Sequence, residues 1–245
     1  MSRPTQLHVR RRSLATTFAL ALGLATLGAV AAPSKPASAA EPAPLDAKVA
    51  EDVVTKVQAF YDQSRTFTAR FNQEFTVKAY NTKRASAGVV FFEKPGKMAW
   101  EYSTPAGNRV VSNGTTVRVY EADNKQMFEQ QVSGAQSGAQ YPAALSFLLG
   151  RGKLSDAFNF QAFAGGDMKF AGGTVLVGTP KTPTPAYTKV LFYVDTATSQ
   201  IRRVLILDAQ GNKNSFVFTE VQVNRPVVAT KFVFEPPPGT TVVKP

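Results

Sequence analysis

Few side chains of this sequence could carry catalytic or metal-binding chemistry. The 245 residues include a single histidine, His8, and no cysteine. His8 lies in the first 40 residues, which we expect to be removed, so the remaining chain would contain neither residue type. This excludes Ser-His-Asp and Cys-His catalysis, zinc sites built on histidine or cysteine, and haem ligation by histidine. We expect no metal site and no cofactor.

Carboxylates leave one catalytic route open. Glu93, Glu101, Glu121 and Asp123 lie near the ends of predicted strands, where two of them could form the acid/base pair of a hydrolase. Glu93 and Glu101 alternate with apolar neighbours, however, which predicts that they lie on the outer, solvated face of the sheet. We therefore expect that the protein is not an enzyme, and a carboxylate-dependent hydrolase stays as the alternative from another class.

The elements that would position any site follow an N-terminal export signal. Arginines at positions 3 and 10–12 precede an apolar run from residue 14 to about residue 32, and small residues follow at positions 37–40. This order is that of a secretory signal peptide, so we expect cleavage near residues 39–40 and export across the inner membrane to the periplasm. Two adjacent arginines before Ser13 and Leu14 leave the choice between general and twin-arginine export open. Without cysteine, the chain has no acceptor for lipidation.

The charge of the remaining chain is modest. The first 40 residues hold 5 of the 28 Lys and Arg and none of the 17 Asp and Glu, which leaves a net charge of +6. The basic residues are scattered singly and form no stripe, so we expect no nucleic-acid partner. We also expect a monomer.

Residues 41–245 predict a single domain that begins with a helix. Apolar residues recur at spacings of three and four over residues 45–61, with charged residues between them, which predicts an amphipathic helix. The residues expected on its apolar face are Leu45, Val49, Val53, Val57, Phe60 and Tyr61.

Nearly all later segments have the two-residue period of strands. In residues 66–78, the side chains of Phe67, Ala69, Phe71, Phe75 and Val77 share one face, and polar side chains share the other. Closely spaced turn signals predict antiparallel hairpins. Residues 141–150 break the strand rhythm and predict a short apolar helix, followed by another near residues 154–158. The other predicted strands cover residues 86–93, 97–102, 109–112, 116–121, 126–131, 159–164, 174–178, 189–195, 201–208, 215–224 and 231–234.

The predicted fold class is mainly β. About eleven strands in one sheet must curl, and the helices could cover the open side as a movable lid. We expect an open, incomplete antiparallel β-barrel with an α-helical lid. Many of the 18 phenylalanines stand at positions that face the concave side, which is either a packed core or an apolar cavity. A covered apolar cavity would bind lipid.

Several motifs together resemble the LolA family of periplasmic lipoprotein carriers. Residues 87–102 read AGVVFFEKPGKMAWEY, and Pro105 and the VVSNG of residues 110–114 follow. The FTARFNQ of residues 67–73 is similar to the first-strand pattern of the family, and the FVFEPPPG of residues 232–239 is similar to its C-terminal pattern. The order and spacing of these motifs extend the resemblance over essentially all of residues 41–245.

The resemblance implies an open barrel with a helical lid that shields the acyl chains of lipoproteins. It further implies transport from an inner-membrane ABC-type release complex to an outer-membrane lipoprotein receptor. At about 0.8 kcal/mol per buried methylene, an acyl chain with on the order of 14 methylenes represents roughly 11 kcal/mol of transfer free energy. Spontaneous desorption would be far too slow, so a carrier is needed.

The resemblance also implies site residues. Lys94 stands where the family has an arginine. The planar guanidinium group would donate several hydrogen bonds to carbonyl oxygens of the lid, whereas the lysine ammonium group is a point charge. Met98 falls where the family has an exposed apolar residue that accepts cargo, and Trp100 where it has an aromatic residue inside the cavity. A solvated turn stays the alternative for Lys94, and a packed core the alternative for Trp100. The residues that would line the cavity or the lid face, with ordinary core as an equal alternative, are Phe71, Phe91, Leu145, Phe147 and Leu148.

A second binding function stays open within the same architecture. Half-barrels of this kind could bind a different lipid, such as a glycolipid, or could act on an envelope-stress regulator. The fold alone does not choose between these binding functions, and identification of copurifying lipid would separate them.

Overall fold

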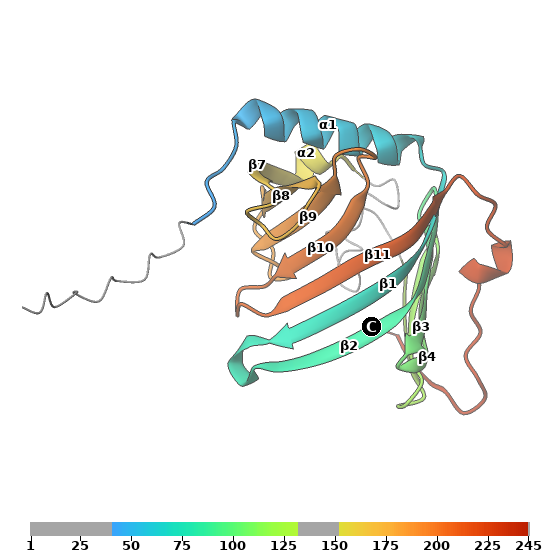
Figure 1. The fold of residues 1–245 in the computed structure, drawn as a ribbon. Helices are drawn as coiled ribbons and strands as arrows, with labels where there is room; N and C mark the ends of the chain where they lie inside the picture. The colour runs from blue at the N-terminus through green and yellow to red at the C-terminus, as the bar shows by residue number, and fades with distance from the viewer. Residues whose placement is uncertain (1–40, 132–151, 245) are drawn as a thin grey trace, which may run out of the picture. The chain divides into compact units, whose positions relative to one another are not determined.

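The computed structural model describes residues 41–131 and 152–244, and these belong to one compact unit that begins at Glu41 (Figure 1). The predicted signal peptide of residues 1–40 and the predicted helix of residues 141–150 lie outside the described residues. Three of the expected cavity residues, Leu145, Phe147 and Leu148, therefore also lie outside them.

In the described residues, twelve strands form one open sheet with the spatial order β12-β6-β5-β4-β3-β2-β1-β11-β10-β9-β8-β7. All neighbours are antiparallel except β12, which runs parallel to β6. The first and last strands of this order do not pair, which confirms the predicted open, mainly antiparallel architecture. The strands are β1 (Thr66–Val77), β2 (Thr82–Glu93), β3 (Lys97–Thr104), β4 (Ala106–Asn113), β5 (Thr116–Glu121), β6 (Gln126–Gln131), β7 (Phe158–Ala164), β8 (Gly173–Pro180), β9 (Lys189–Asp195), β10 (Ile201–Leu207), β11 (Lys213–Val223) and β12 (Thr241–Val243).

The short turns that join these strands use the residues expected from the sequence. In the β4–β5 turn, the Asn113 side-chain oxygen accepts hydrogen bonds from the backbone N–H groups of Thr115 and Thr116 at 2.9 and 2.8 Å. Gly114 adopts φ 101°, a conformation that a side chain would strain. These local bonds shape the tight turn through which β4 and β5 pair antiparallel.

Helix α1 (Ala47–Gln63) crosses the sheet above β7 to β11 (Figure 1). Its N-cap residue, Asp46, accepts a hydrogen bond from the Lys48 N–H at 2.8 Å. The helix buries Ala50, Val54, Val57 and Tyr61. The predicted helix is thus confirmed, and so is most of its predicted apolar face, since Val57 and Tyr61 are buried and Val53 and Phe60 pack against the core. The prediction is wrong only at its N-terminal end, because Leu45 precedes the helix and is 38% exposed, and Val49 is also exposed.

The face of the sheet that α1 covers is called the inner face, and the opposite face the outer face. Alternate residues of β1 point to the inner face, where Phe67, Ala69 and Phe71 join the main apolar core together with α1. This confirms the apolar side that the sequence predicted for the first strand. The inner face is therefore the surface on which any apolar binding site would form.

The C-terminal segment departs from the predicted pattern. Residues 231–234 were expected to form a strand, but a 3-10 helix, η4 (Ala229–Phe232), occupies part of this stretch. The expectation is wrong because Phe232 is buried against the outer face of β3 and β4 and does not pair with a strand. The following residues lead to the short strand β12, which the sequence did not predict.

A short helix, α2 (Leu154–Ala157), precedes β7, as predicted. The N–H of Leu154 donates a hydrogen bond to the Gln58 side-chain oxygen at 2.8 Å, which ties α2 to α1. Within residues 41–131 and 152–244, no helix is both long and apolar enough to cross a membrane.

Candidate functional site

An aromatic cluster around Trp100 dominates the inner face. Trp100 projects from β3 and is 4% exposed. The ring centroid of Phe71 lies 4.8 Å from that of Trp100, in an edge-to-face arrangement. The rings of Phe216 and Phe92 follow at 5.5 and 6.0 Å. Because four strands contribute these rings, the cluster is a property of the folded sheet and cannot form in any one hairpin.

The cluster continues to the helix. Phe67 lies 6.0 Å from Phe92 and 6.2 Å from Tyr61 of α1, measured between ring centroids. The Tyr61 hydroxyl accepts a hydrogen bond from the Ile201 N–H at 3.1 Å, and burial raises the pKa of this tyrosine. An unbroken apolar surface thus runs from Trp100 to the underside of α1.

A second aromatic group lies on β7 and β9. The Phe158 ring is 5.7 Å from Phe192 and 5.6 Å from Phe160. Phe158 and Phe192 belong to the same buried core as Trp100 and the residues of α1. The sequence pattern did not single out these residues, since their strands are separated by long stretches of chain and only the sheet order brings them together.

Phe91 does not lie where it was expected. It faces the outer side of β2, where its neighbours are Ala99, Val111 and Phe232, and the Lys231 ammonium nitrogen lies 4.9 Å from its ring centroid. Its neighbour Phe92 points to the inner face. The expectation for Phe91 is wrong because Phe91 and Phe92 are adjacent in β2 and point to opposite faces of the sheet. The sequence alone does not show that the C-terminal segment covers the outer face, where Phe91 lies.

Met98 is also placed differently from the exposed position that the resemblance implied. Its side chain is 2% exposed and belongs to the main core with Trp100. The registers explain this burial, because Met98 pairs with Phe92 and with Ser112, both of which are buried. Met98 therefore belongs to the interior of the inner face and not to its rim.

Lys94 contacts the helix. Its ammonium group donates a hydrogen bond to the Tyr61 carbonyl oxygen in the last turn of α1, and its N–H donates to the Arg65 carbonyl at 2.9 Å. Burial lowers the pKa of Lys94, and the nearby Asp62 carboxylate raises it in part. Lysine at this position thus supplies one charged donor to a helix carbonyl, so the reading of Lys94 as only a solvated turn residue does not hold in this structure.

A polar row bounds the aromatic cluster on the inner face. The Tyr102 ring packs edge-on against Phe71 at 5.1 Å, and its hydroxyl lies 3.5 Å from the Gln73 side-chain oxygen. The Gln73 amide in turn donates to the Asn214 side-chain oxygen at 2.9 Å. Burial raises the pKa of Tyr102 to about 12. The inner face therefore changes from apolar to polar one step beyond Phe71.

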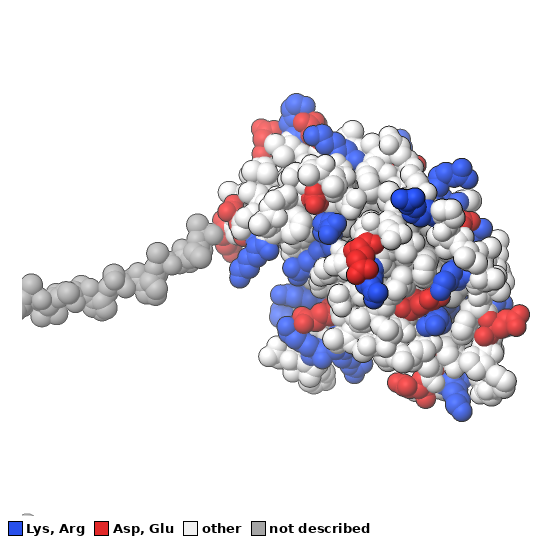
Figure 2. Space-filling model, turned by 45° about the vertical axis from the view of Figure 1, so that its right-hand side comes forward, with Lys and Arg blue, Asp and Glu red and all other residues white. Residues whose placement is uncertain are grey.

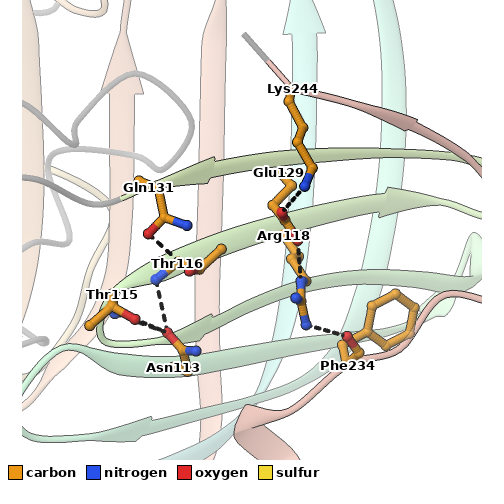
Figure 3. Close-up of polar contacts among 8 residues, drawn as sticks. All are labelled: Asn113, Thr115, Thr116, Arg118, Glu129, Gln131, Phe234 and Lys244. Atoms are coloured by element: carbon orange, nitrogen blue, oxygen red, sulfur yellow. Dashed lines mark hydrogen bonds and ion pairs between the residues drawn. The ribbon is translucent and has the colours of Figure 1, made fainter.

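The outer face of β3 to β6 is covered by the C-terminal segment. The Lys231 ammonium nitrogen bonds both Glu101 carboxylate oxygens at 2.9 Å. Figure 3 shows Arg118 donating to Glu129 and to the Phe234 carbonyl oxygen, both at 2.8 Å. The bonds of Lys231 and Phe234 therefore attach the C-terminal segment to β3 and β5.

The same contacts bear on the hydrolase alternative. Glu101 is paired with Lys231, and Glu93 with Lys97 at 2.7 Å, on the outer face as predicted. Carboxylates held in ion pairs with separate lysines do not form an acid/base pair across a cleft. Among the described residues, no three His, Cys, Asp or Glu side chains come together as metal ligands.

Comparison with known sequences decides the family. The family model described as "Outer membrane lipoprotein carrier protein LolA" matches residues 62–235. The chain belongs to the LolA family. This match spans β1 to η4 and therefore includes Lys94, Trp100 and the C-terminal segment over the outer face. LolA proteins are carriers, so the family assignment agrees with the expectation that the chain is not an enzyme.

Named relatives agree with the LolA assignment. The chain is 28% identical over 207 residues to the outer-membrane lipoprotein carrier protein of Chromobacterium violaceum, a match that covers 84% of this chain and 94% of that protein. It is 26% identical over 201 residues to the carrier of Nitrosomonas europaea, covering 82% and 93%. Among solved structures, a LolA superfamily protein from Nitrosomonas europaea gives a TM-score of 0.43 at 12% identity and covers 76% of this chain and 97% of that one.

Proposed function

We propose that this chain carries acylated lipoproteins through the periplasm from an inner-membrane ABC-type release complex to an outer-membrane receptor. The observation that carries the proposal is the aromatic inner face around Trp100 beneath an amphipathic helix, in a chain that matches the LolA family over residues 62–235. The proposal includes export by the signal peptide of residues 1–40, cleaved near residues 39–40. Membership in the LolA family supports lipoproteins as the cargo.

The acyl chains would bind on the inner face. Trp100 and Phe71 stand at the centre of this surface, and the side chains of Phe92 and Met98 extend it. Transfer of a chain with about 14 methylenes from water to such a surface is favourable by roughly 11 kcal/mol, which is enough to make a soluble lipoprotein complex stable. The polar row of Tyr102, Gln73 and Asn214 would lie beside the glycerol end of the lipid.

Binding requires the inner face to open, because its rings are packed against one another and against α1. The bonds from Lys94 and Ile201 to Tyr61 both hold the C-terminal turn of α1. The rest of the helix contacts the sheet mainly through small and β-branched side chains, Ala50, Val54 and Val57. We therefore propose that α1 pivots about its C-terminal turn and exposes the aromatic surface when cargo enters.

The single tryptophan allows a direct test. Trp100 is the only tryptophan in the sequence, so its emission reports on the inner face alone. A triacylated lipopeptide with bromine atoms on its acyl chains should quench most of this emission, whereas the same lipopeptide brominated only on its peptide should not. Equal quenching by both lipopeptides, or by neither, would contradict binding of acyl chains at Trp100.

Copurification provides the second test. Protein exported by cells should carry triacylated lipoprotein that mass spectrometry detects, and Trp100→Glu should lose it while Trp100→Phe retains it. Circular dichroism and thermal melting should show that both variants are folded. Recovery of a free glycolipid or phospholipid in place of lipoprotein would favour the related lipid-binding function, and no bound apolar material would mean that the inner face is only a packed core.

A further inference from the structure

The turn between β1 and β2 presents an exposed aromatic ring among basic side chains. The 3-10 helix η1 (Lys78–Tyr80) forms this turn. Tyr80 is 79% exposed and is the one exposed aromatic residue in the described part of the chain. Asn81 follows with φ 49°, the left-handed conformation that asparagine tolerates. The N–H of Lys78 donates to the Asn212 side-chain oxygen at 2.9 Å. The turn is therefore held in place by the neighbouring β10–β11 turn, and Tyr80 is presented at a defined position.

Basic residues flank this ring in the sequence. Lys78 lies in the turn itself, and Lys83 and Arg84 begin β2; all three are exposed. The turn at positions 78–84 thus contains three basic residues, no acidic residue and one exposed tyrosine. We call Tyr80 with Lys78, Lys83, Lys189 and Lys213 the basic tip.

The strand registers place three of these lysines in one row. Lys83 and Lys213 both pair with Thr76 of β1, one from each side. Lys189 and Lys213 both pair with Leu207 of β10 in the same way. Residues paired across neighbouring strands point to the same face, so all three lysines lie on the outer face. Each lysine is two strands away from the next, which separates their backbones by about 10 Å. Figure 2 shows Lys and Arg side chains gathered toward the lower left of the molecule.

Acidic residues offset only part of this charge. The Glu74 carboxylate lies 3.0 Å from the Lys83 ammonium group. The Asp208 carboxylate accepts hydrogen bonds from the N–H and side-chain amide of Asn212, both at 2.8 Å, and so serves to fold the β10–β11 turn. The four lysines of the basic tip thus outnumber the two nearby carboxylates, which leaves a positive surface.

We propose that the basic tip docks this protein reversibly on anionic phospholipid membranes. Lysines about 10 Å apart suit a membrane surface, where phosphate headgroups can move to meet each ammonium group. Unlike a guanidinium group, an ammonium group does not need a planar acceptor that offers two oxygens. Tyrosine is amphipathic and favours the headgroup level of a bilayer. An acidic protein is a poorer fit because the two cavities along β1 and β2, of about 440 and 320 Å³, include none of the four lysines or Tyr80, whereas protein partners anchor aromatic residues in pockets.

The position of the tip suits a carrier that must approach a membrane without losing its cargo. β1 has 12 residues, so the basic tip lies roughly 36 Å along the strand from the junction between α1 and β1. Docking at the tip would leave the bonds to Tyr61, at the opposite end of β1, undisturbed, so the proposed pivot of α1 could still work. This inference goes beyond lipoprotein binding, because it concerns lipid headgroups and does not require an open inner face.

Vesicle binding tests the proposal. Exported protein stripped of bound lipid would be mixed with vesicles of phosphatidylcholine containing 30% phosphatidylglycerol, and with pure phosphatidylcholine vesicles, at low salt. We expect sedimentation with the anionic vesicles only, and loss of binding at high salt. The triple variant K78Q/K83Q/K213Q should bind about 100-fold more weakly, since each lysine near an anionic surface contributes about fivefold. Tyr80→Ser should weaken binding severalfold without lowering the melting temperature, because the ring is exposed.

Matched controls separate this surface from net charge and from cargo binding. The variant K56Q/K125Q/K169Q removes three exposed lysines elsewhere and should retain vesicle binding. Trp100→Glu should also retain it, so that failure of cargo binding and failure of membrane docking are distinguishable. Equal weakening by the two triple variants, or no binding to anionic vesicles at low salt, would overturn the proposal. A photocrosslinker at position 80 that labels an acidic protein and no lipid would also overturn it, in favour of a protein partner.

Discussion

The Lys94 ammonium group donates a hydrogen bond to the carbonyl oxygen of Tyr61 and so joins the end of β2 to the last turn of α1. Tyr61 is held a second time, by the Ile201 N–H that bonds its hydroxyl. The C-terminal turn of α1 is therefore fixed to two parts of the sheet that lie on either side of β1 and β11. The residues just before α1 are also held, because the Leu45 N–H donates to the Ala162 carbonyl oxygen at 2.7 Å. Movement of α1 about its C-terminal turn therefore requires this bond to break.

Replacement of Lys94 by methionine should loosen this pivot. The apolar stem is retained, but the charged hydrogen bond to Tyr61 is lost. Because burial already disfavours the charged amine, we expect a loss of only about 1 kcal/mol in the free energy of unfolding. Amide exchange in the last turn of α1 should accelerate by about fivefold. Lys94→Arg, which keeps a charged donor, is the control, and unchanged exchange in Lys94→Met would show that the bond does not hold the helix.

Phe91 and Phe92 form a matched pair on opposite faces. Phe92→Ala removes a fully buried ring next to Trp100 and should lower the free energy of unfolding by about 4 kcal/mol. Phe91→Ala removes a half-buried ring beneath Lys231 and should cost about half as much. Only Phe92→Ala should weaken quenching of Trp100 by brominated acyl chains. Equal effects of the two substitutions on this quenching would mean that cargo does not bind on the inner face.

Gly88 permits the close contact between β2 and β3 beside Trp100. A Cβ atom added at Gly88 would lie 2.0 Å from the Glu101 carbonyl oxygen and 2.9 Å from the Phe71 ring. Backbone cannot yield to such a clash without breaking the pairing, so Gly88→Ala should lower the free energy of unfolding by about 3 kcal/mol in urea denaturation. Gly166→Ala is the control, because nothing lies within 4 Å of a Cβ atom there. A cost below 1 kcal/mol for Gly88→Ala would contradict the assigned register.

Most of the sheet could be predicted because its strands carry strong local signals. The bounds of β5, β6 and β9 agree with the prediction at both ends. Gly114 precedes β5, Asp123 and Asn124 separate β5 from β6, and β9 ends at Asp195. The predicted C-terminal strand was wrong because the alternation of Phe232 and Phe234 reflects packing on the outer face, not pairing. Alternation alone cannot distinguish these two causes.

The site was predictable only in part, because burial depends on contacts made far along the chain. Trp100 and Phe71 could be placed on one face from their strands, but Phe216 approaches Trp100 only through the pairing of β1 with β11. The sequence likewise gives no sign that Lys231 covers Phe91. The helix face was predictable in part: Val57 and Tyr61 are buried as expected, but Ala50, which is small and does not stand out as apolar, is buried with them.

Low pH should loosen β12, because Glu129 then loses the charge that binds Lys244. Hydrogen bonds from Arg118 and Lys244 lower the pKa of Glu129 below its usual value of 4.5. The stabilisation that this carboxylate provides is therefore complete above the unfolded pKa and is lost as the pH falls through the lower folded pKa. We expect Glu129→Gln to speed amide exchange in β12 at pH 6, and this difference from the unsubstituted protein should shrink toward pH 3. Glu235→Gln, which removes a carboxylate without an ion pair in the described chain, should show no such trend. A difference that is as large at pH 3 as at pH 6 would mean that Glu129 acts through packing and not through its charge.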